Sequence, residues 1–190
     1  MDITAIAFVV LLACVGLERL LELRLSRRHQ RDLALLGAQK RADPQYHWMI
    51  ALHAGVLTGA ALEVVFLRRP FIVPLAAAAL LAFLLATALR WWVIRTLGTH
   101  WNTEVVDSAT LGVVSKGPFR WIRHPNYLGV FVEMIALPLV HTAWITVIFA
   151  AAGNLLVLRN RLRVEEGVLD SAPAYRSAMA GKPRFLPKIF

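Results

Sequence analysis

The sequence predicts an all-α integral membrane protein with about five transmembrane helices. Of its 190 residues 58% are hydrophobic, yet the formal net charge is +9. This combination is typical of membrane proteins with basic loops and is rare in soluble domains. Apolar runs that reach or approach the roughly 20 residues of a spanning helix occur at residues 3–17, 48–67, 71–94 and 128–158.

The length and the flanking residues of each run indicate which kind of helix it forms. The first run lacks a basic segment before it and a small-residue cleavage site after it, so we expect a retained helix and no signal peptide. The run 128–158 is too long for one ordinary span. Because Pro138 removes a backbone donor inside it, we expect a helical hairpin there, which brings the number of helices to five.

The positions of the basic residues support the hairpin. Lys and Arg cluster in cytoplasmic loops of membrane proteins, and only a hairpin returns the chain to the side that it left. Arg68 and Arg69 lie on the other side, and we expect them to snorkel towards water. The clusters that we assign to the cytoplasm are Arg24, Arg27, Arg28, Arg31, Lys40 and Arg41; Arg95, Lys116, Arg120 and Arg123; and Arg159, Arg161 and Arg163.

Composition also limits the classes of function. No repeat or polar linker divides the chain, so we expect a single domain over residues 1–190. The basic residues flank apolar segments and do not form a soluble basic face, so nucleic acid is not an expected partner. Cys14 is the one cysteine, and we therefore expect neither an intrachain disulfide nor a metal cluster.

A polar, imidazole-bearing loop directly precedes the last apolar run. It spans residues 116–129 and contains Arg123-His124-Pro125. A hairpin would bring His124 beside the polar segment that follows the last run, at one edge of the membrane. On a continuing helix Arg161 and Glu165 would share a face and could pair or jointly contact a zwitterionic ligand. We therefore predict a binding site at this edge.

These motifs resemble the isoprenylcysteine carboxyl methyltransferase family and its small bacterial relatives, which are integral membrane enzymes that use S-adenosyl-L-methionine. The resemblance covers residue 98 to the C-terminus. It is carried by Gly-Pro-Phe-Arg-x-x-Arg-His-Pro-x-Tyr-x-Gly at 117–129, Arg-x-x-x-Glu-Glu-x-x-Leu at 161–169, Tyr175, and Arg-Phe-Leu-Pro at 184–187. It implies a cytosolic cofactor pocket in residues 98–190, with the helices of residues 1–97 on the substrate side.

The resemblance also implies roles for single residues. Arg161 would contact the substrate and, with His124, would be catalytic. Phe119 stands where family members often have tyrosine, which keeps an aromatic wall but removes a hydroxyl. The residues implied in cofactor binding are Glu104, Leu111, Gly112, Val113, Val114, Phe119, His124, Pro125, Asn126, Tyr127 and Glu165.

The implied reaction is methyl transfer to an oxygen of a lipophilic acceptor that arrives from the bilayer. Such an in-line displacement can be catalysed largely by positioning and desolvation, so no metal is required. A carboxylate acceptor would need only Arg161 to orient it. A phenol or an enol would also need a base, for which His124 and Glu166 are candidates.

The first half says less about the acceptor. The run 18–28, with Tyr46-His47-Trp48, is loosely similar to bacterial members associated with long-chain polyketide products such as alkylpyrones and phenolic lipids. Glu63 and Glu133 lie within predicted spans, where each could mark a pathway or make an interhelical hydrogen bond. We expect His47 and His53 to be interfacial or packing residues.

Two other classes of membrane protein remain as alternatives. Sterol reductases carry a similar Arg-His-Pro and Asn-Tyr signature and bind NADPH, but they are about twice as long. A non-catalytic membrane subunit would bind neither cofactor. The resemblance places the protein in a bacterial inner membrane, but leaves the acceptor undetermined among prenylcysteine, alkylpyrone and phenolic lipid.

Overall fold

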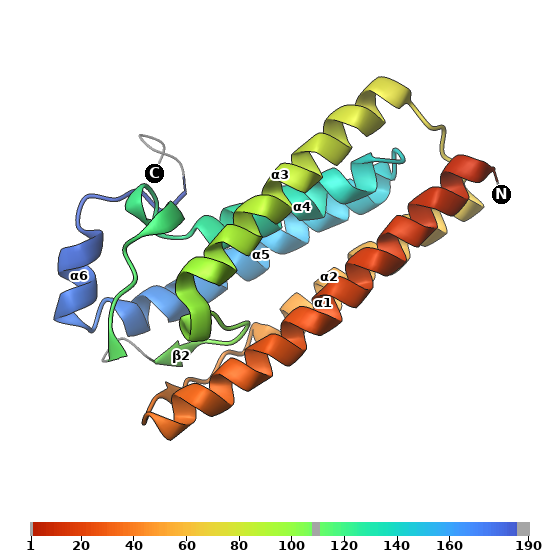
Figure 1. Ribbon diagram of the computed structural model, residues 1–190. Helices are drawn as coiled ribbons and strands as arrows, with labels where there is room; N and C mark the ends of the chain where they lie inside the picture. The colour runs from red at the N-terminus through yellow and green to blue at the C-terminus, as the bar shows by residue number, and fades with distance from the viewer. Residues whose placement is uncertain (1, 108–110, 186–190) are drawn as a thin grey trace.

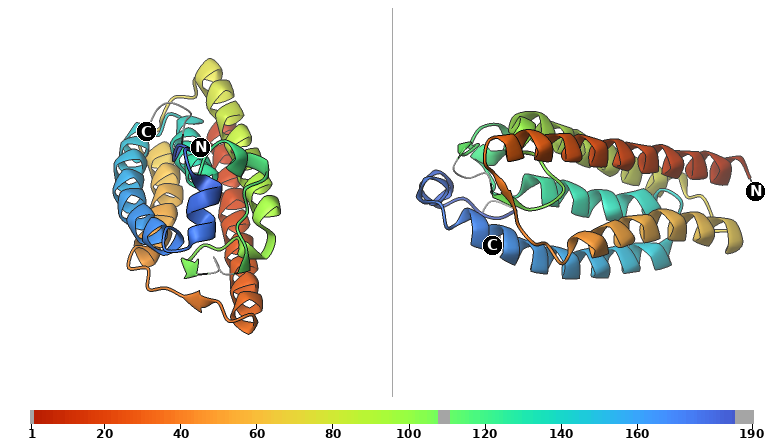
Figure 2. Two further views of the ribbon diagram at one scale, coloured as in Figure 1. Left: turned by 90° about the vertical axis from the view of Figure 1, so that its left-hand side faces the viewer. Right: turned by 90° about the horizontal axis from the view of Figure 1, so that it is seen from below.

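The computed structural model describes residues 2–107 and 111–185. Successive long helices run in alternating directions along an elongated bundle, and the last short helix lies across one end (Figures 1 and 2). We call this end the site end, and the opposite end the tip. The helices are α1 (Ile3–Leu35), α2 (Tyr46–Phe66), α3 (Val73–Leu97), α4 (Pro125–Leu139), α5 (Trp144–Leu169) and α6 (Pro173–Met179).

Helix α1 is much longer than the apolar run that predicted it. Its 33 residues extend about 50 Å, well beyond the roughly 30 Å of a hydrocarbon core. No glycine or proline interrupts residues 18–35. Buried residues at helical spacing, among them Ser26, His29 and Leu33, hold this extension against the rest of the protein. Arg24 to Arg31, which lie between the first two apolar runs, are therefore on the helical extension of α1.

Four helices, α1, α2, α3 and α5, are long and apolar enough to cross a membrane, by length and composition among the described residues. Helix α4 has 15 residues and spans only about 22 Å. It is short because Pro125 begins it, after residues used by the site loop, and because Pro138 lies in its last turn. The predicted fifth span is thus a shorter apolar helix.

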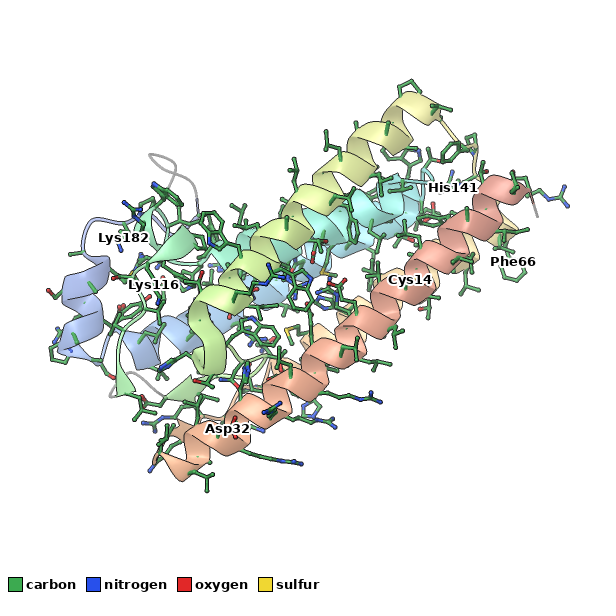
Figure 3. All side chains as sticks on the ribbon, in the orientation of Figure 1. Cys14, Asp32, Phe66, Lys116, His141 and Lys182 are labelled. Atoms are coloured by element: carbon green, nitrogen blue, oxygen red, sulfur yellow. The ribbon has the colours of Figure 1, made fainter. Side chains whose placement is uncertain are left out.

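The chain does double back after α4, as the sequence predicted. Residues 140–143 make the turn, and α5 returns along α4 towards the site end (Figure 1). Thr142 has a φ of +53°, and its hydroxyl donates to the carbonyl of Pro70 at 2.7 Å. His141 is fully buried in the same turn, near the start of α1 and far from Lys116 and Lys182 (Figure 3).

Glu63 has a structural role in this turn. Its carboxylate accepts the backbone N–H groups of Ile145 at 3.0 Å and Thr146 at 2.8 Å, and so satisfies the first donors of α5. It also pairs with Arg69 at 2.7 Å. Of the two roles open for Glu63, the structure therefore shows the interhelical hydrogen bond. It also shows how one of the two arginines at this end is neutralised.

A buried ion cluster ties α1, α3 and α4 together halfway along the bundle. Arg90 contacts Glu133 at 3.0 Å and Glu22 at 2.7 Å, and Arg19 contacts the same two carboxylates at 3.1 and 2.8 Å. The hydroxyl of Thr87 donates to Glu133 at 2.7 Å. Buried charges are tolerated when they are paired in this way. Glu133 is therefore also an interhelical partner.

Candidate functional site

The site loop is fixed by a close approach to α3. Gly117 has a φ of +58° and starts a short 3-10 helix, Gly117–Arg120 (η3). A Cβ atom at Gly117 would lie only 2.6 Å from the Thr96 Oγ1 atom, so only glycine fits both the conformation and the space. The side chain of Phe119 is consequently buried against α3, and the loop delivers His124 to the start of α4.

The C-terminal segment holds His124 in place. The backbone N–H groups of Arg123 and His124 donate to the carbonyls of Pro183 and Arg184 at 2.9 and 3.0 Å. The Arg184 guanidinium donates to both oxygens of Glu166, at 2.9 and 2.6 Å. The His124 Nε2 atom lies 3.2 Å from the same carboxylate. Glu166 is thus engaged in a bidentate ion pair, which argues against its use as a base.

Arg161 and Glu165 are linked, but through a third residue. The Tyr127 hydroxyl donates to the Glu165 carboxylate and accepts a hydrogen bond from Arg161 Nε at 2.9 Å. Arg161 is 5% exposed, donates to the carbonyl of Thr103 and lies against the Met49 sulfur. The predicted relation between the arginine and the glutamate therefore depends on the tyrosine between them.

At this end, two groups that lie outside the membrane-spanning helices, Arg184 and Tyr175, have shifted pKa values. Hydrogen bonds to Glu166 raise the pKa of Arg184 further above its usual range, so this ion pair stays charged at any assay pH. Burial raises the pKa of Tyr175, on α6, to about 12. Its phenol is therefore neutral and can act as a hydrogen-bond donor.

A cavity of about 380 Å³ opens among α1, α2, α4, α5 and the loops at the site end. Residues of its wall come from both halves of the sequence. From α1 and α2 come apolar side chains such as Leu20, Ile50 and Leu57. The predicted site residues in its wall are Glu104, Gly112, Val113, Val114, Phe119, His124, Pro125, Asn126, Tyr127, Arg161 and Glu165.

Leu111 is the exception among the predicted site residues. It does not line the cavity, and 37% of it is exposed. Gly112, which follows it, has a φ of +122° and redirects the chain, so that Val113 and Val114 reach the wall and Leu111 does not. The structure therefore does not bring Leu111 to the cavity wall with the other predicted residues, and its contact with a cofactor stays a prediction.

Glu104 reaches the wall, but its carboxylate already has partners. It pairs with Lys40 of β1 (Gln39–Lys40) and accepts a hydrogen bond from Gln30 Nε2 at 3.3 Å. Strand β1 lies antiparallel to β2 (Val106–Asp107), which holds this loop over the cavity. A contact between Glu104 and a cofactor would have to compete with Lys40 and Gln30 for the carboxylate.

Unpaired polar atoms collect around the cavity. Among the described residues, most of the buried side-chain polar atoms that have no hydrogen-bond partner belong to residues of its wall. Buried polar atoms in proteins are nearly always paired, so such a cluster needs an explanation, and a ligand supplies one. They are Trp101 Nε1, Asn102 Oδ1, Arg123 Nε and Asn126 Oδ1 at the site end, and Glu22 Oε1, Arg90 Nε and Asn154 Nδ2 deeper in the bundle.

The sequence did not predict the deeper part of the wall as a site, and it indicated an interfacial or packing role for His53. His53, Asn154, Arg19, Glu22 and Arg90 all line the cavity. Each is a polar residue next to or within a predicted apolar run, which was the one signal that pointed to them. Only the packing of α1 and α2 against α4 and α5 shows that they face a common space.

The fold and the cavity define a class: a helical membrane protein whose internal cavity joins a polar end to an apolar interior. The sequence model of the isoprenylcysteine carboxyl methyltransferase (ICMT) family matches residues 78–171, from the second turn of α3 to just beyond the end of α5. The match includes His124, Tyr127, Arg161 and Glu165. The chain belongs to this family.

Two bacterial proteins are similar along most of the chain. An uncharacterized protein of Bacillus subtilis, YpbQ, is 28% identical over 164 residues, which are 86% of this chain and 96% of that protein. An uncharacterized protein of Haemophilus influenzae is 25% identical over 159 residues, which are 83% of this chain and 92% of that protein. The similarity to both therefore extends into the N-terminal helices that the family match leaves out.

Proposed function

We propose that the protein transfers a methyl group from S-adenosyl-L-methionine to an oxygen of a lipophilic acceptor held in the membrane. The observation that carries the proposal is the cavity, whose wall gathers the unpaired polar atoms. Its site end offers charged and hydrogen-bonding groups, whereas α1 and α2 offer apolar ones. Membership of the methyltransferase family supports this reaction class.

The residues at the site end fit the cofactor chemically. S-adenosyl-L-methionine supplies an activated methyl group on a cationic sulfur, and it also carries an ammonium, a carboxylate and a flat adenine. Glu165 is an acid for the cationic groups, and Trp101 Nε1 and Asn126 Oδ1 are an unpaired donor and acceptor. Val113 and Phe119 offer an apolar wall for the adenine.

The protein's own contribution is positioning. Arg161 is held between Tyr127, the Thr103 carbonyl and Met49, so its guanidinium is fixed where the polar and apolar parts of the cavity meet. An acceptor oxygen oriented there would be held in line with the methyl group and kept from water. Positioning and desolvation of this kind can account for much of the rate enhancement of methyl transfer. The basic residues at the site end support a cytosolic orientation, in the inner membrane of a bacterium.

Cofactor binding tests the proposal. We expect the purified protein in detergent to bind S-adenosyl-L-methionine in isothermal titration calorimetry, and Glu165→Gln or His124→Ala to abolish this binding. Arg161→Ala should depress turnover more than cofactor affinity, because Arg161 also faces the acceptor side. Circular dichroism and gel filtration would show that the variants are folded.

Asp170→Asn is the matched control for Glu165→Gln. It makes the same kind of charge change on an exposed residue at the end of α5, outside the cavity wall, so cofactor affinity should stay unchanged. A titration with NADPH covers the reductase alternative. Binding of NADPH in place of S-adenosyl-L-methionine, or of neither, would refute the proposal.

A further inference from the structure

His53 presents a ring nitrogen to the deep part of the cavity. Its Nδ1 atom lies 2.8 Å from the carbonyl of Met49, one turn earlier in α2. A carbonyl oxygen can only accept, so Nδ1 carries the hydrogen, and in the neutral ring Nε2 is left with a lone pair. No described residue contacts Nε2 through a hydrogen bond, and the ring lines the cavity.

Asn154 of α5 lines the same cavity as His53 of α2. It is 6% exposed, and its Nδ2 atom has no hydrogen-bond partner among the residues that the structure describes. The two side chains lie at the same depth, because Gly153 of α5 packs directly against Leu52 of α2. An unpaired donor and an unpaired acceptor therefore face one space.

The position of His53 and Asn154 along the bundle suits methyl transfer to an acceptor that Arg161 orients. Met49 contacts Arg161, and His53 is one helical turn, about 6 Å, further along α2. Arg161 of α5 and Arg19 of α1 line the same cavity as His53, and each is paired with carboxylates. His53 therefore lies within about one helical turn of the arginine that is proposed to orient the acceptor.

The other candidate bases are occupied. Both oxygens of Glu166 accept from Arg184, and His124 Nε2 faces the same carboxylate. The Glu165 carboxylate accepts from Tyr127. Glu22 Oε1 also lacks a partner in the cavity wall, but Glu22 Oε2 is ion-paired with Arg19 and Arg90. The His53 ring, in contrast, is oriented by a backbone carbonyl and makes no ion pair among the described residues, and its Nε2 atom is left to accept a proton.

We infer that His53 is the general base for an acceptor with an acidic hydroxyl, a phenol or an enol, and that Asn154 donates a hydrogen bond to the acceptor oxygen. This inference rests on the proposed function. The hydroxyl proton passes to His53 Nε2 and later to water. The acceptor oxygen bonds to the methyl carbon as the carbon–sulfur bond of the sulfonium donor breaks, and the electron pair of that bond stays on sulfur as a neutral thioether.

Substitution of His53 tests the assignment in turnover. With a long-chain alkylphenol, His53→Gln should lower kcat by at least about 100-fold, the usual contribution of a general base, and should leave the affinity for S-adenosyl-L-methionine unchanged. Asn154→Leu, which keeps the size of the side chain and removes the donor, should raise the KM for the acceptor. His47→Gln is the matched control, because His47 is exposed on the same helix and does not line the cavity.

A second measurement uses protein without cofactor. A long-chain alkyl 4-nitrophenol reports its own ionisation by visible absorbance when it binds. At fixed pH, the ratio of phenolate to phenol in the bound probe should fall about tenfold from wild type to His53→Gln, which equals one pKa unit of the probe. His47→Gln should leave the ratio unchanged.

The outcomes separate this inference from the proposed function. If wild type binds no S-adenosyl-L-methionine and transfers no methyl group, both fail. If wild type methylates a phenol and His53→Gln does so within about threefold of its rate, or if the bound probe ionises equally in both, the proposed function stands and His53 is not the base. A wild type that methylates lipid carboxylates alone would also overturn the inference.

Discussion

At the scale of single residues, Tyr127 is the centre of the candidate site. Its hydroxyl is a donor to Glu165 and an acceptor from Arg161, so two charged side chains depend on one oxygen atom. Its ring also contacts the imidazole of His124, with centroids 5.7 Å apart. The sequence placed Tyr127 in the cofactor pocket, but the bridging role appears only when α4 and α5 are packed together.

Removal of this hydroxyl should disturb both charged partners. Hydrogen bonds to charged groups contribute about 1.5–3 kcal/mol, so Tyr127→Phe should weaken cofactor affinity or turnover by about 10- to 100-fold. Calorimetry and methyl-transfer assays would measure this. Tyr46→Phe makes the same change outside the cavity wall and should have no effect. Values within about twofold of wild type for both variants would contradict the bridging role.

At the scale of the elements, the contact between α3 and α4 positions the site. A Cβ atom at Gly129 would lie 2.6 Å from Arg90 Cγ and 3.3 Å from the carbonyl of Ala86. Gly129 therefore allows α4 to approach α3 closely enough for Arg90 to reach Glu133 at 3.0 Å. His124 and Tyr127 lie at the start of the same helix, so the packing of α4 also sets their position.

Gly129→Ala should push α4 away from α3. We expect a loss of about 1–3 kcal/mol, the usual cost of overpacking, seen as a lower midpoint of thermal unfolding in detergent. Cofactor affinity should fall as well, because His124 and Tyr127 move with the helix. Gly167→Ala is the control, since a Cβ atom there meets no neighbour within 4 Å. Equal unfolding midpoints for the two variants would show that the close approach does not matter.

At the scale of the whole molecule, the return of the chain through residues 140–143 creates the site. Because α5 runs back along α4, Glu165 and Glu166 arrive beside His124, and the C-terminal segment then covers them. A single continuous helix would have placed these groups at opposite ends of a span. The turn between α2 and α3 lies at the other end, with Arg69 paired to Glu63 (Figure 1).

Cysteine labelling in intact membrane vesicles tests this arrangement. In a Cys14→Ser background, cysteines at Arg120 and Arg163 should react with an impermeant reagent from the same face, and a cysteine at Arg68 from the opposite face. All three positions are exposed. Labelling of the Arg120 and Arg163 positions from opposite faces would refute the hairpin in the membrane.

The sequence by itself determined the helical membrane class, the return at Pro138 and the family motifs, because apolar length, proline and charge act locally along the chain. All the site residues that it predicted except Leu111 line the cavity, since most of them lie in two short motifs, but other residues of the same wall, such as Trp101 and Asn102, were not predicted. The apolar run did not show how far α1 extends, because charged residues form a helix as readily as apolar ones when a partner buries one face of that helix.

Only the tertiary structure decided what the isolated polar residues do. Glu63 caps α5, Glu133 pairs with arginines, and His53 faces the cavity, although all three look alike in sequence as polar residues in apolar helices. Their roles depend on which helix lies opposite, at distances of a few ångströms. Those distances are set by packing between segments far apart in the chain, as between His53 and Asn154, and no local pattern encodes them.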